Sequence, residues 1–451
     1  MTGPLYKWVV TGADGPHPFS DVALLEAMLR FEVALAQAQA RLGLIPDRCA
    51  ALIAQHAGTT PLDPVVLARA GAQAGSLAIP FVQAVVAHVA SQDPVAARYV
   101  HYGTTSQDLL DTALVLCART AVTQLDQELH RAGRAAISLA RRHAGTPALA
   151  RTLLQPAAVT TVGFRCAQWA QALARSRRRL LDDADAALAV SLGGAVGNLA
   201  AWGDAGGRLR AELASALGLS DPGATWHTQR DGWIGLAANA ALATGVVAKA
   251  ARDIALMAQA EVGEAQEPAV AGRGGSTAMP HKHNPVLSMR VLAAAQPVPG
   301  LVAGLLAAMP QEYERALGNW QAETAQAPEV FIHALAAAHA LAELLEGVRF
   351  DEQRCRANIE ALEGTIFSES LANLFAPALG KPEAQALVAT LCTRAITTRT
   401  HLRGLAHEQL ASEDRLSAVA KADVDAVFDL DRAARASAQQ VQPMLEGLSG
   451  G

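Results

Sequence analysis

The chain has 451 residues, of which 51% are hydrophobic and only 18% charged, and its formal net charge is −5. This length exceeds one ordinary globular core. The slightly negative charge provides no broad basic field for nucleic acid or an anionic membrane. Abundant alanine and leucine, with few aromatic residues, favour helices over sheets. So much apolar surface under so few charges favours a homo-oligomer with large helical interfaces.

The first long helix is predicted over residues 20–43. Leu24, Met28 and Phe31 recur at the spacing of one helix face, and Gly43 closes the segment. More short helices are expected up to about residue 100.

Longer helices are predicted in three stretches without proline, at 109–144, 223–267 and 329–350. The apolar segment 285–309 is expected to kink at Pro297 and Pro299. We find no run of 18 uninterrupted apolar residues, so no membrane span is expected. No alternating pattern supports a parallel sheet. Several long helices in mid-chain therefore predict an extended bundle.

These patterns divide the chain into an N-terminal helical domain (1–108), a central long-helix bundle (109–350) and a small C-terminal helical domain (351–451). The last region is broken into short helices by segments such as GTIFSES and APALGKPEAQ. The five cysteines form no CxxC pair, and the first residues lack the features of a signal peptide. Both observations favour a reducing cytoplasm.

Residues 272–286, GRGGSTAMPHKHNPV, interrupt the helical pattern in mid-chain. Glycine leaves such a loop mobile. A loop that carries one hydroxyl, Ser276, and one ammonium, Lys282, is suited to close over a substrate and exclude water. The alternative is a helix connector with no chemical task. His281 and His283 lack an obvious third metal ligand and no phosphate-binding loop is present, so we expect neither metal nor cofactor.

The segment GSTAMPHKHN fits the pattern G-S-x-x-M-x-x-K-x-N and resembles the signature of the fumarase/aspartase superfamily. HYGTTSQDLLDT at 101–112 and RTLLQPAAVTT at 151–161 are similar to its two other blocks. WHTQRD and ERALGNWQAE resemble the branch of 3-carboxy-cis,cis-muconate cycloisomerases. The resemblance implies an all-α fold of three domains, whose central bundle assembles four chains. It also implies active sites that form where three chains meet.

The resemblance further implies roles for individual residues. Ser276 stands at the position of the family's catalytic serine. Lys282 and Asn284 stand where the family contacts a substrate carboxylate. Thr105 and Ser106 match hydroxyls that bind a carboxylate at the opposite wall. The remaining candidates are a substrate-side amide, two cations for the other negative charges and one histidine at the turn: Gln155, Arg230, Arg315 and His101. Each arginine has the alternative of an ordinary salt bridge, and His101 that of a helix cap.

Three positions depart from the family pattern. Leu153 replaces the histidine that assists the leaving group in most superfamily lyases, and leucine cannot transfer a proton. The cycloisomerases usually carry arginine or lysine at the position of His283 and tryptophan at the position of Thr324. These changes leave open which substrate the pocket takes.

The missing acid favours a ring closure. A muconate carboxylate, with a pKa of about 4, is already ionised and needs no base, and it is tethered to the double bond that it attacks. Lys282 would stabilise the charge that develops beside another carboxylate, and Ser276 would supply the proton. We therefore expect a cycloisomerase that closes 3-carboxy-cis,cis-muconate to 4-carboxymuconolactone. The alternatives are a β-elimination lyase whose leaving group, such as nitrite, departs without an acid, and a non-catalytic descendant.

Overall fold

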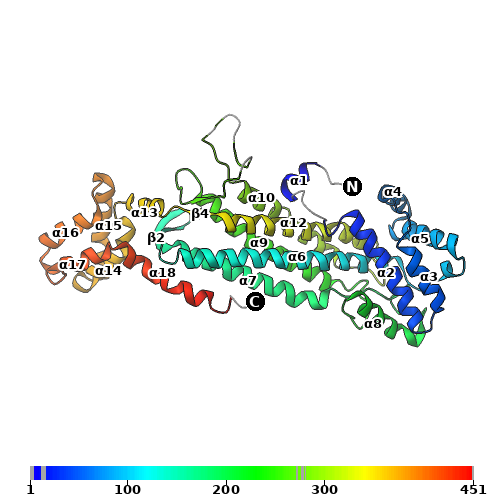
Figure 1. The fold of residues 1–451 in the computed structure, drawn as a ribbon. Helices are drawn as coiled ribbons and strands as arrows, with labels where there is room; N and C mark the ends of the chain where they lie inside the picture. The colour runs from blue at the N-terminus through cyan, green and yellow to red at the C-terminus, as the bar shows by residue number, and fades with distance from the viewer. Residues whose placement is uncertain (1–4, 12–16, 271–272, 276–278, 280, 449–451) are drawn as a thin grey trace. The chain divides into compact units, whose positions relative to one another are not determined.

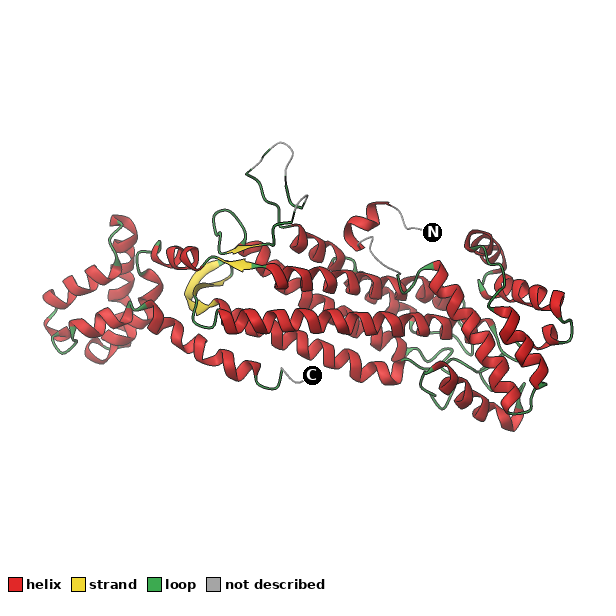
Figure 2. Ribbon diagram, viewed as in Figure 1, coloured by secondary structure: helices red, strands yellow, loops and turns green. Residues whose placement is uncertain are grey.

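The computed structural model describes residues 5–11, 17–270, 273–275, 279 and 281–448. Its regular structure is almost entirely helical, which confirms the all-α prediction (Figure 1; Figure 2). The helices form two compact units. Unit 1 comprises residues 1–129, 175–248 and 290–340, and unit 2 comprises residues 130–174, 249–289 and 341–451. The division into three consecutive domains stays a prediction.

Unit 1 contains the predicted N-terminal helices. The hydroxyl of Ser20 accepts the N–H of Ala23 at 3.2 Å and so caps α2. Met28 and Phe31 are fully buried, as their spacing predicts. The helices that lie wholly in unit 1 are α1 (Leu5–Thr11), α2 (Asp21–Arg41), α3 (Asp47–Ala57), α4 (Pro64–Ala74), α5 (Ala78–Gln92), α8 (Gly206–Leu217) and α11 (Val298–Ala308).

Several helices, most of them long, contribute residues to both units. They are α6 (Ser106–Arg142), α7 (Val162–Ala187), α9 (Asp231–Met257), α10 (Val286–Ala295) and α12 (Asn319–Gly347). The predicted helix at 109–144 is confirmed by α6. Within 223–267, a long helix is confirmed, but α9 is shorter than the predicted stretch at both ends. α12 begins well before the predicted start at residue 329 and carries Pro328 inside it. Ala327 and Val330 beside this proline are fully buried, so packing outweighs the backbone hydrogen bond that proline removes.

The predicted break at Pro297 is confirmed, because α10 ends before this residue and α11 begins after it. The expectation about membrane-spanning length needs a correction. Asp231–Met257, Val286–Ala308 and Asn319–Gly347 are each long and apolar enough by length and composition alone, with mean hydropathies of 1.4, 1.7 and 1.3. Alanine-rich helices with few charges reach these means without an uninterrupted apolar run. Half or more of the apolar window is buried in α9 and in α12, so packing within the protein covers much of both helices.

Unit 2 holds two short antiparallel strand pairs that the sequence did not predict (Figure 2). β1 (Pro147–Thr152) and β2 (Gln155–Thr161) form a hairpin, and β3 (Ala265–Gln266) pairs with β4 (Arg349–Phe350). The hydroxyl of Thr160 in the hairpin donates to Ser437 of α18 at 3.2 Å. The remaining helices are α13 (Glu352–Glu360), α14 (Ser368–Leu379), α15 (Lys381–Thr398), α16 (Leu402–Ser412), α17 (Lys421–Val427) and α18 (Leu430–Leu445). The short helices between α14 and α17 share a core of their own.

Candidate active site

The predicted site residues fall into two sets, one in each unit. His101, Thr105, Ser106, Arg230 and Arg315 belong to unit 1. Unit 2 contributes the other three described candidates, Gln155, Lys282 and Asn284. The predicted catalytic serine, Ser276, lies outside the described residues.

Two predicted residues of unit 1 are in direct contact at the start of α6. The guanidinium of Arg315 donates to the hydroxyl of Thr105 at 2.9 Å and to the carbonyl of Ala195 at 2.9 Å. Arg315 is exposed, and no carboxylate of the described chain forms an ion pair with it. Ser106, the first residue of α6, is half-buried beside Thr105. A free cation next to two hydroxyls and a helix N-terminus is suited to bind a carboxylate.

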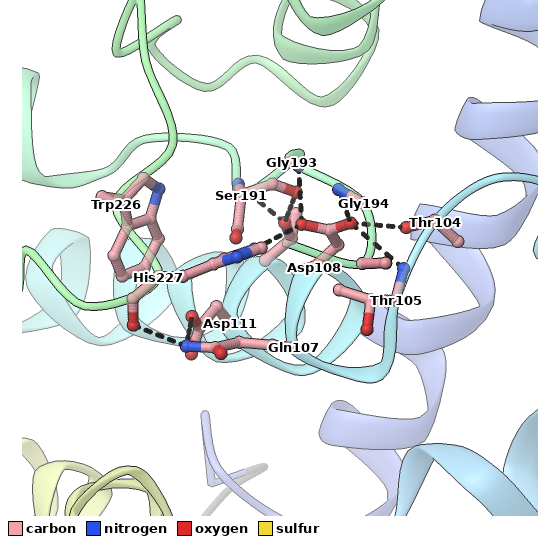
Figure 3. Close-up of polar contacts among 12 residues, drawn as sticks. Thr104, Thr105, Gln107, Asp108, Asp111, Ser191, Gly193, Gly194, Trp226 and His227 are labelled. Atoms are coloured by element: carbon pink, nitrogen blue, oxygen red, sulfur yellow. Dashed lines mark hydrogen bonds and ion pairs between the residues drawn. The ribbon is translucent and has the colours of Figure 1, made fainter. Parts of the chain in front are cut away.

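Thr105, Ser106 and Arg315 together are called the wall of unit 1. The carboxylate of Asp108 holds the backbone of this wall in place. It is fully buried and accepts five hydrogen bonds (Figure 3). The donors are the hydroxyl of Thr104 at 3.0 Å, the backbone N–H groups of Thr105 at 3.1 Å, Gly193 at 2.8 Å and Gly194 at 2.9 Å, and Nε2 of His227 at 2.7 Å. Asp108 therefore ties the turn before α6 to the glycine loop that contains Ala195.

His101 precedes this turn with a φ of 57°. Its Nδ1 lies 2.6 Å from Oε1 of Glu32, and its backbone N–H donates to Oε2 at 3.0 Å. The Glu32 side chain is almost fully buried. Glu32 thus fixes both the ring and the backbone of His101 in a conformation that non-glycine residues adopt rarely. The histidine therefore anchors the turn before α6.

Arg230 lies in a buried ionic cluster. Its side chain pairs with Asp111 at 2.7 Å and with Glu323, whose Oε2 lies 3.0 Å from Nε. The guanidinium also stacks on Trp226, with Cζ 4.4 Å from the ring centroid. Asp111 in turn accepts the indole N–H of Trp320 at 2.9 Å. A substrate carboxylate at Arg230 would have to displace a protein carboxylate from a dry site, which is costly.

The charges of this cluster stabilise one another. Burial alone would lower the pKa of Arg230, but Asp111 and Glu323 outweigh burial and raise it. Burial also raises the pKa of Glu323, although Arg230 opposes this shift. The cluster therefore keeps a permanent cation beneath the wall.

A cavity of about 350 Å³ opens in unit 1 along α6. Leu110 and Leu114 line it, and they follow Ser106 at one-turn intervals on the same helix face. Trp320 and Thr324 of α12 form another wall. The full lining consists of uncharged residues: Leu24, Gly71, Ala72, Gly75, Ser76, Leu77, Leu110, Leu114, Trp320, Gln321 and Thr324. The departure at Thr324 thus affects the shape of a real cavity, and its volume suits a small molecule.

In unit 2, Asn284 binds Gly274 and so joins the two ends of the signature loop. These two residues are called the neck of the loop. The backbone N–H and the side-chain Nδ2 of Asn284 both donate to the carbonyl of Gly274, at 2.9 and 3.2 Å. Gly274 has a φ of 74°, and an added Cβ would lie 2.8 Å from the carbonyl oxygen of Asn284. Only glycine fits this close approach. Beyond the neck, Glu267 accepts the N–H groups of Leu287 and Ser288 at the start of α10.

Lys282 belongs to the loop segment between Gly274 and Asn284, and its side chain is exposed. Its backbone N–H donates to the carbonyl of Met279 at 3.0 Å, so a turn fixes its main chain. No described carboxylate forms an ion pair with its ammonium group. The ammonium is available to a ligand.

The hairpin that carries Gln155 has an unusual tip. Leu153 and Leu154 form its two-residue connection with φ values of 52° and 65° and are 97% and 70% exposed. Such turns normally contain asparagine and glycine. Gln155 begins β2 and is exposed. Next to the tip, Arg151 pairs with the buried Glu264 at 2.7 Å. The hairpin thus presents two exposed apolar residues in the left-handed backbone region, which leucine adopts rarely.

Within the described part of the chain, no three His, Cys, Asp or Glu side chains converge as metal ligands. Burial raises the pKa of the thiols of Cys117, Cys166 and Cys355 to about 12. These thiols remain protonated at neutral pH and are not suited to act as nucleophiles.

Sequence reasoning assigned no role to Asp108, His227 or Glu32. Asp108 stands in TTSQD and His227 in WHTQRD, two segments that resemble the family, so the sequence did mark both regions. An acidic residue in the first turn of a helix commonly binds the preceding backbone N–H groups. Glu32 lies one turn after Met28 and three residues before Leu35, on the buried side of α2. A charge within the apolar stripe indicates a buried partner but does not identify it, because His101 is distant in the chain.

Comparisons with known proteins establish the class. The model of a lyase family matches residues 17–300. A 3-carboxy-cis,cis-muconate cycloisomerase from Pseudomonas aeruginosa is 43% identical over 92% of this chain and 88% of its own length. The chain therefore belongs to this family, the fumarase/aspartase superfamily of lyases.

The relatives differ in the reaction that their names describe. The crystal structure of a 3-carboxy-cis,cis-muconate lactonizing enzyme from Pseudomonas putida superposes with a TM-score of 0.88 at 36% identity and covers 96% of each chain. A nitrosuccinate lyase from Streptomyces davaonensis is also 43% identical, over 82% of this chain and 79% of its own. Overall identity therefore does not separate a ring closure from an elimination.

Proposed function

We propose that the protein is a cofactor-independent cycloisomerase that closes 3-carboxy-cis,cis-muconate to 4-carboxymuconolactone in the protocatechuate branch of aromatic catabolism. The observation that carries the proposal is the hairpin tip, where Leu153 provides no acid. Relatives of that name match nearly the whole chain. Ring closure suits such a site, because the nucleophile is an ionised carboxylate and no group leaves.

The reaction needs the protein to stabilise a developing negative charge, to supply a proton and to exclude water. A substrate carboxylate oxygen forms a bond to one carbon of the conjugated system. The electron pair of that double bond moves to the neighbouring carbon and spreads onto its own carboxylate. Lys282 stabilises this enolate-like charge, and Ser276 delivers the proton that completes the addition. Closure of the loop between Gly274 and Asn284 over the substrate would remove water and strengthen both effects.

The wall of unit 1 binds a second carboxylate in this proposal. Arg315, Thr105 and Ser106 supply a cation and two hydroxyls on a preorganised turn. Gln155 provides an amide from the hairpin. Arg230 acts from beneath, because its charge is already met by Asp111 and Glu323. His101 holds the turn through Glu32.

We propose that four copies assemble and share their active sites, in the cytoplasm, with a small polycarboxylate as the substrate. The apolar segment Val286–Ala308 is only 28% buried within one chain. Leu242 and Leu306 are more than half exposed, and so are the hairpin leucines Leu153 and Leu154. Contact with other copies would cover these surfaces. Sedimentation velocity tests the assembly, and a stable monomer would refute it.

The decisive assay follows the ultraviolet absorbance of 3-carboxymuconate, which falls when the conjugated diene closes. We expect rapid loss with the wild-type protein and a decrease of about a thousandfold or more in Ser276→Ala. Thr277→Ala, which removes the neighbouring hydroxyl, serves as the matched control and should remain active. A wild-type protein that leaves the absorbance unchanged, or a Ser276→Ala variant that turns over normally, would refute the proposal.

A second candidate is a β-elimination lyase that forms fumarate or a related unsaturated acid. Leu153 also permits this reaction when the leaving group, such as nitrite, needs no proton, and the nitrosuccinate lyase is equally similar. The same protein preparation is therefore incubated with nitrosuccinate, and release of nitrite is measured. Nitrite without loss of the diene would favour this candidate over the cycloisomerase. Silence in both assays from a correctly folded protein would favour a descendant without catalysis.

A further inference from the structure

The imidazole of His227 is held in one orientation beneath the wall of unit 1. Its Nε2 lies 2.7 Å from Oδ1 of Asp108, and its side chain is 2% exposed. Asp108 accepts four other donors, so Nε2 carries the hydrogen of this bond. The backbone carbonyl of His227 accepts a hydrogen bond from the side-chain amide of Gln107 at 2.7 Å (Figure 3). An added Cβ on Gly193 would lie 2.9 Å from Cε1 of His227, so the ring fills its space. His227 therefore cannot turn away without breaking the network.

Arg315 spans the two segments that Asp108 ties together. One guanidinium nitrogen donates to Thr105 in the turn before α6, and the other donates to Ala195 in the glycine loop. A single oxygen of Asp108, Oδ2, accepts the N–H of Thr105 and that of Gly194. The separation of these two acceptors, and hence the place of the cation, follows from the geometry at Asp108.

We propose that Asp108 and His227 are positioning residues, which set Thr105 and Arg315 at the spacing that a substrate carboxylate requires. The proposal rests on the proposed function in one respect, because it takes Arg315 as a substrate-binding cation. Without the hydrogen bond from His227, Oδ1 of Asp108 keeps only the N–H of Gly193, and the carboxylate can rotate as a unit about its bond to Cβ. Oδ2, which accepts the N–H groups of both Thr105 and Gly194, moves with it. The spacing of the turn and the glycine loop then changes, and Arg315 loses one of its two anchors. The main effect falls on substrate binding, since none of the groups that act on the reacting carbon is touched.

The experiment compares two amides at position 227. His227→Gln places an amide N–H near the position of Nε2, whereas His227→Asn reaches only the position of Nδ1. In the part of the chain that the structure describes, Nδ1 of His227 has no hydrogen-bond partner, so glutamine loses no bond there. We expect His227→Asn to raise KM about tenfold or more, because a hydrogen bond to a charged group is lost. The value of kcat should change far less. His227→Gln should restore most of the affinity.

A double-mutant cycle distinguishes positioning from simple loss of stability. If His227 acts through Arg315, the effect of His227→Asn on KM should largely disappear in an Arg315→Gln background. Equal KM values in the asparagine and glutamine variants would overturn the proposal. So would a full, additive effect in the Arg315→Gln background. If the asparagine variant does not fold, Thr104→Val, which removes another donor to Asp108, replaces it in the same cycle.

Failure of the proposed function can be told apart from failure of this inference. A wild-type protein that does not consume 3-carboxymuconate refutes the cycloisomerase alone. The dissociation constant for tricarballylate, a saturated tricarboxylate, is then measured by calorimetry for the wild type and the variants. Weaker binding in His227→Asn than in His227→Gln supports positioning. The same dissociation constant in all three proteins, or no binding to the wild type, overturns it.

Discussion

The two sets of candidate residues are held in place by different kinds of force. In unit 1, Thr105 and Arg315 rest on a dry network of carboxylates, of which Asp108 and Asp111 are fully buried. In unit 2, Lys282 is held by a backbone turn and is itself exposed. The first set is fixed by buried side-chain hydrogen bonds, whereas Lys282 is fixed through its main chain and leaves its ammonium group exposed. In the proposed function, binding falls to the first set and chemistry to the second.

The sharpest test of this contrast is Arg230→Met. Methionine leaves Asp111 and Glu323 buried without their cation, so we expect the free energy of unfolding to fall by about 3–5 kcal/mol. Urea denaturation followed by tryptophan fluorescence measures the change. Arg177→Met in the same unit removes the partner of Asp126 from a partly exposed pair and should cost no more than about 1 kcal/mol. A similar decrease in the free energy of unfolding in both variants would show that the buried cluster does not contribute specially to the stability of unit 1.

Lys282→Met should show the opposite profile. Loss of the ammonium removes charge stabilisation from the transition state, and we expect kcat to fall by about 100–1000-fold. The thermal midpoint should stay unchanged, because the side chain is exposed and forms no ion pair in the described chain. Lys381→Met, at an exposed position of unit 2, controls for the loss of one charge. A stability loss in the Lys282 variant, or normal turnover, would contradict the assignment of chemistry to the loop.

The sequence predicted the loop and the long helices better than it predicted the network beneath the wall. Gly274 and the lysine motif are local signals, and the apolar stripe of α2 follows from helix periodicity alone. Asp108 and His227 are 119 residues apart, and no local pattern reports which distant polar groups become partners. Arg230 shows the same difficulty. Its charge suggested a ligand contact, but the fold supplies two carboxylates that already neutralise it.

The hairpin tip tests whether exposure in unit 2 serves assembly. Leu153→Asn with Leu154→Gly gives the turn its preferred residues and should relieve about 1 kcal/mol of backbone strain per residue. If other copies cover these leucines in the proposed tetramer, the double variant should dissociate at concentrations where the wild type stays assembled. Sedimentation velocity follows the assembly, and the matched change Val65→Asn with Val66→Gly on α4 controls for lost apolar surface. An intact tetramer with a higher thermal midpoint would leave strain relief as the only effect.

The smallest expected effect concerns pH at the base of the same hairpin. Burial lowers the pKa of His143 below 6.5, and the nearby Glu352 offsets part of this shift. The folded state therefore binds the proton less readily than the unfolded state. The stabilisation is complete above pH 6.5 and is lost as the pH falls from 6.5 toward the lowered pKa. His143→Asn keeps a polar group opposite the Thr146 hydroxyl but does not titrate. Hydrogen-exchange protection of residues 147–161, corrected for intrinsic rates, should decrease less between pH 7.5 and 5.5 in this variant. His281→Asn on the exposed loop controls for the loss of a histidine, and an equal decrease in all three proteins would place the pH sensitivity of unit 2 elsewhere.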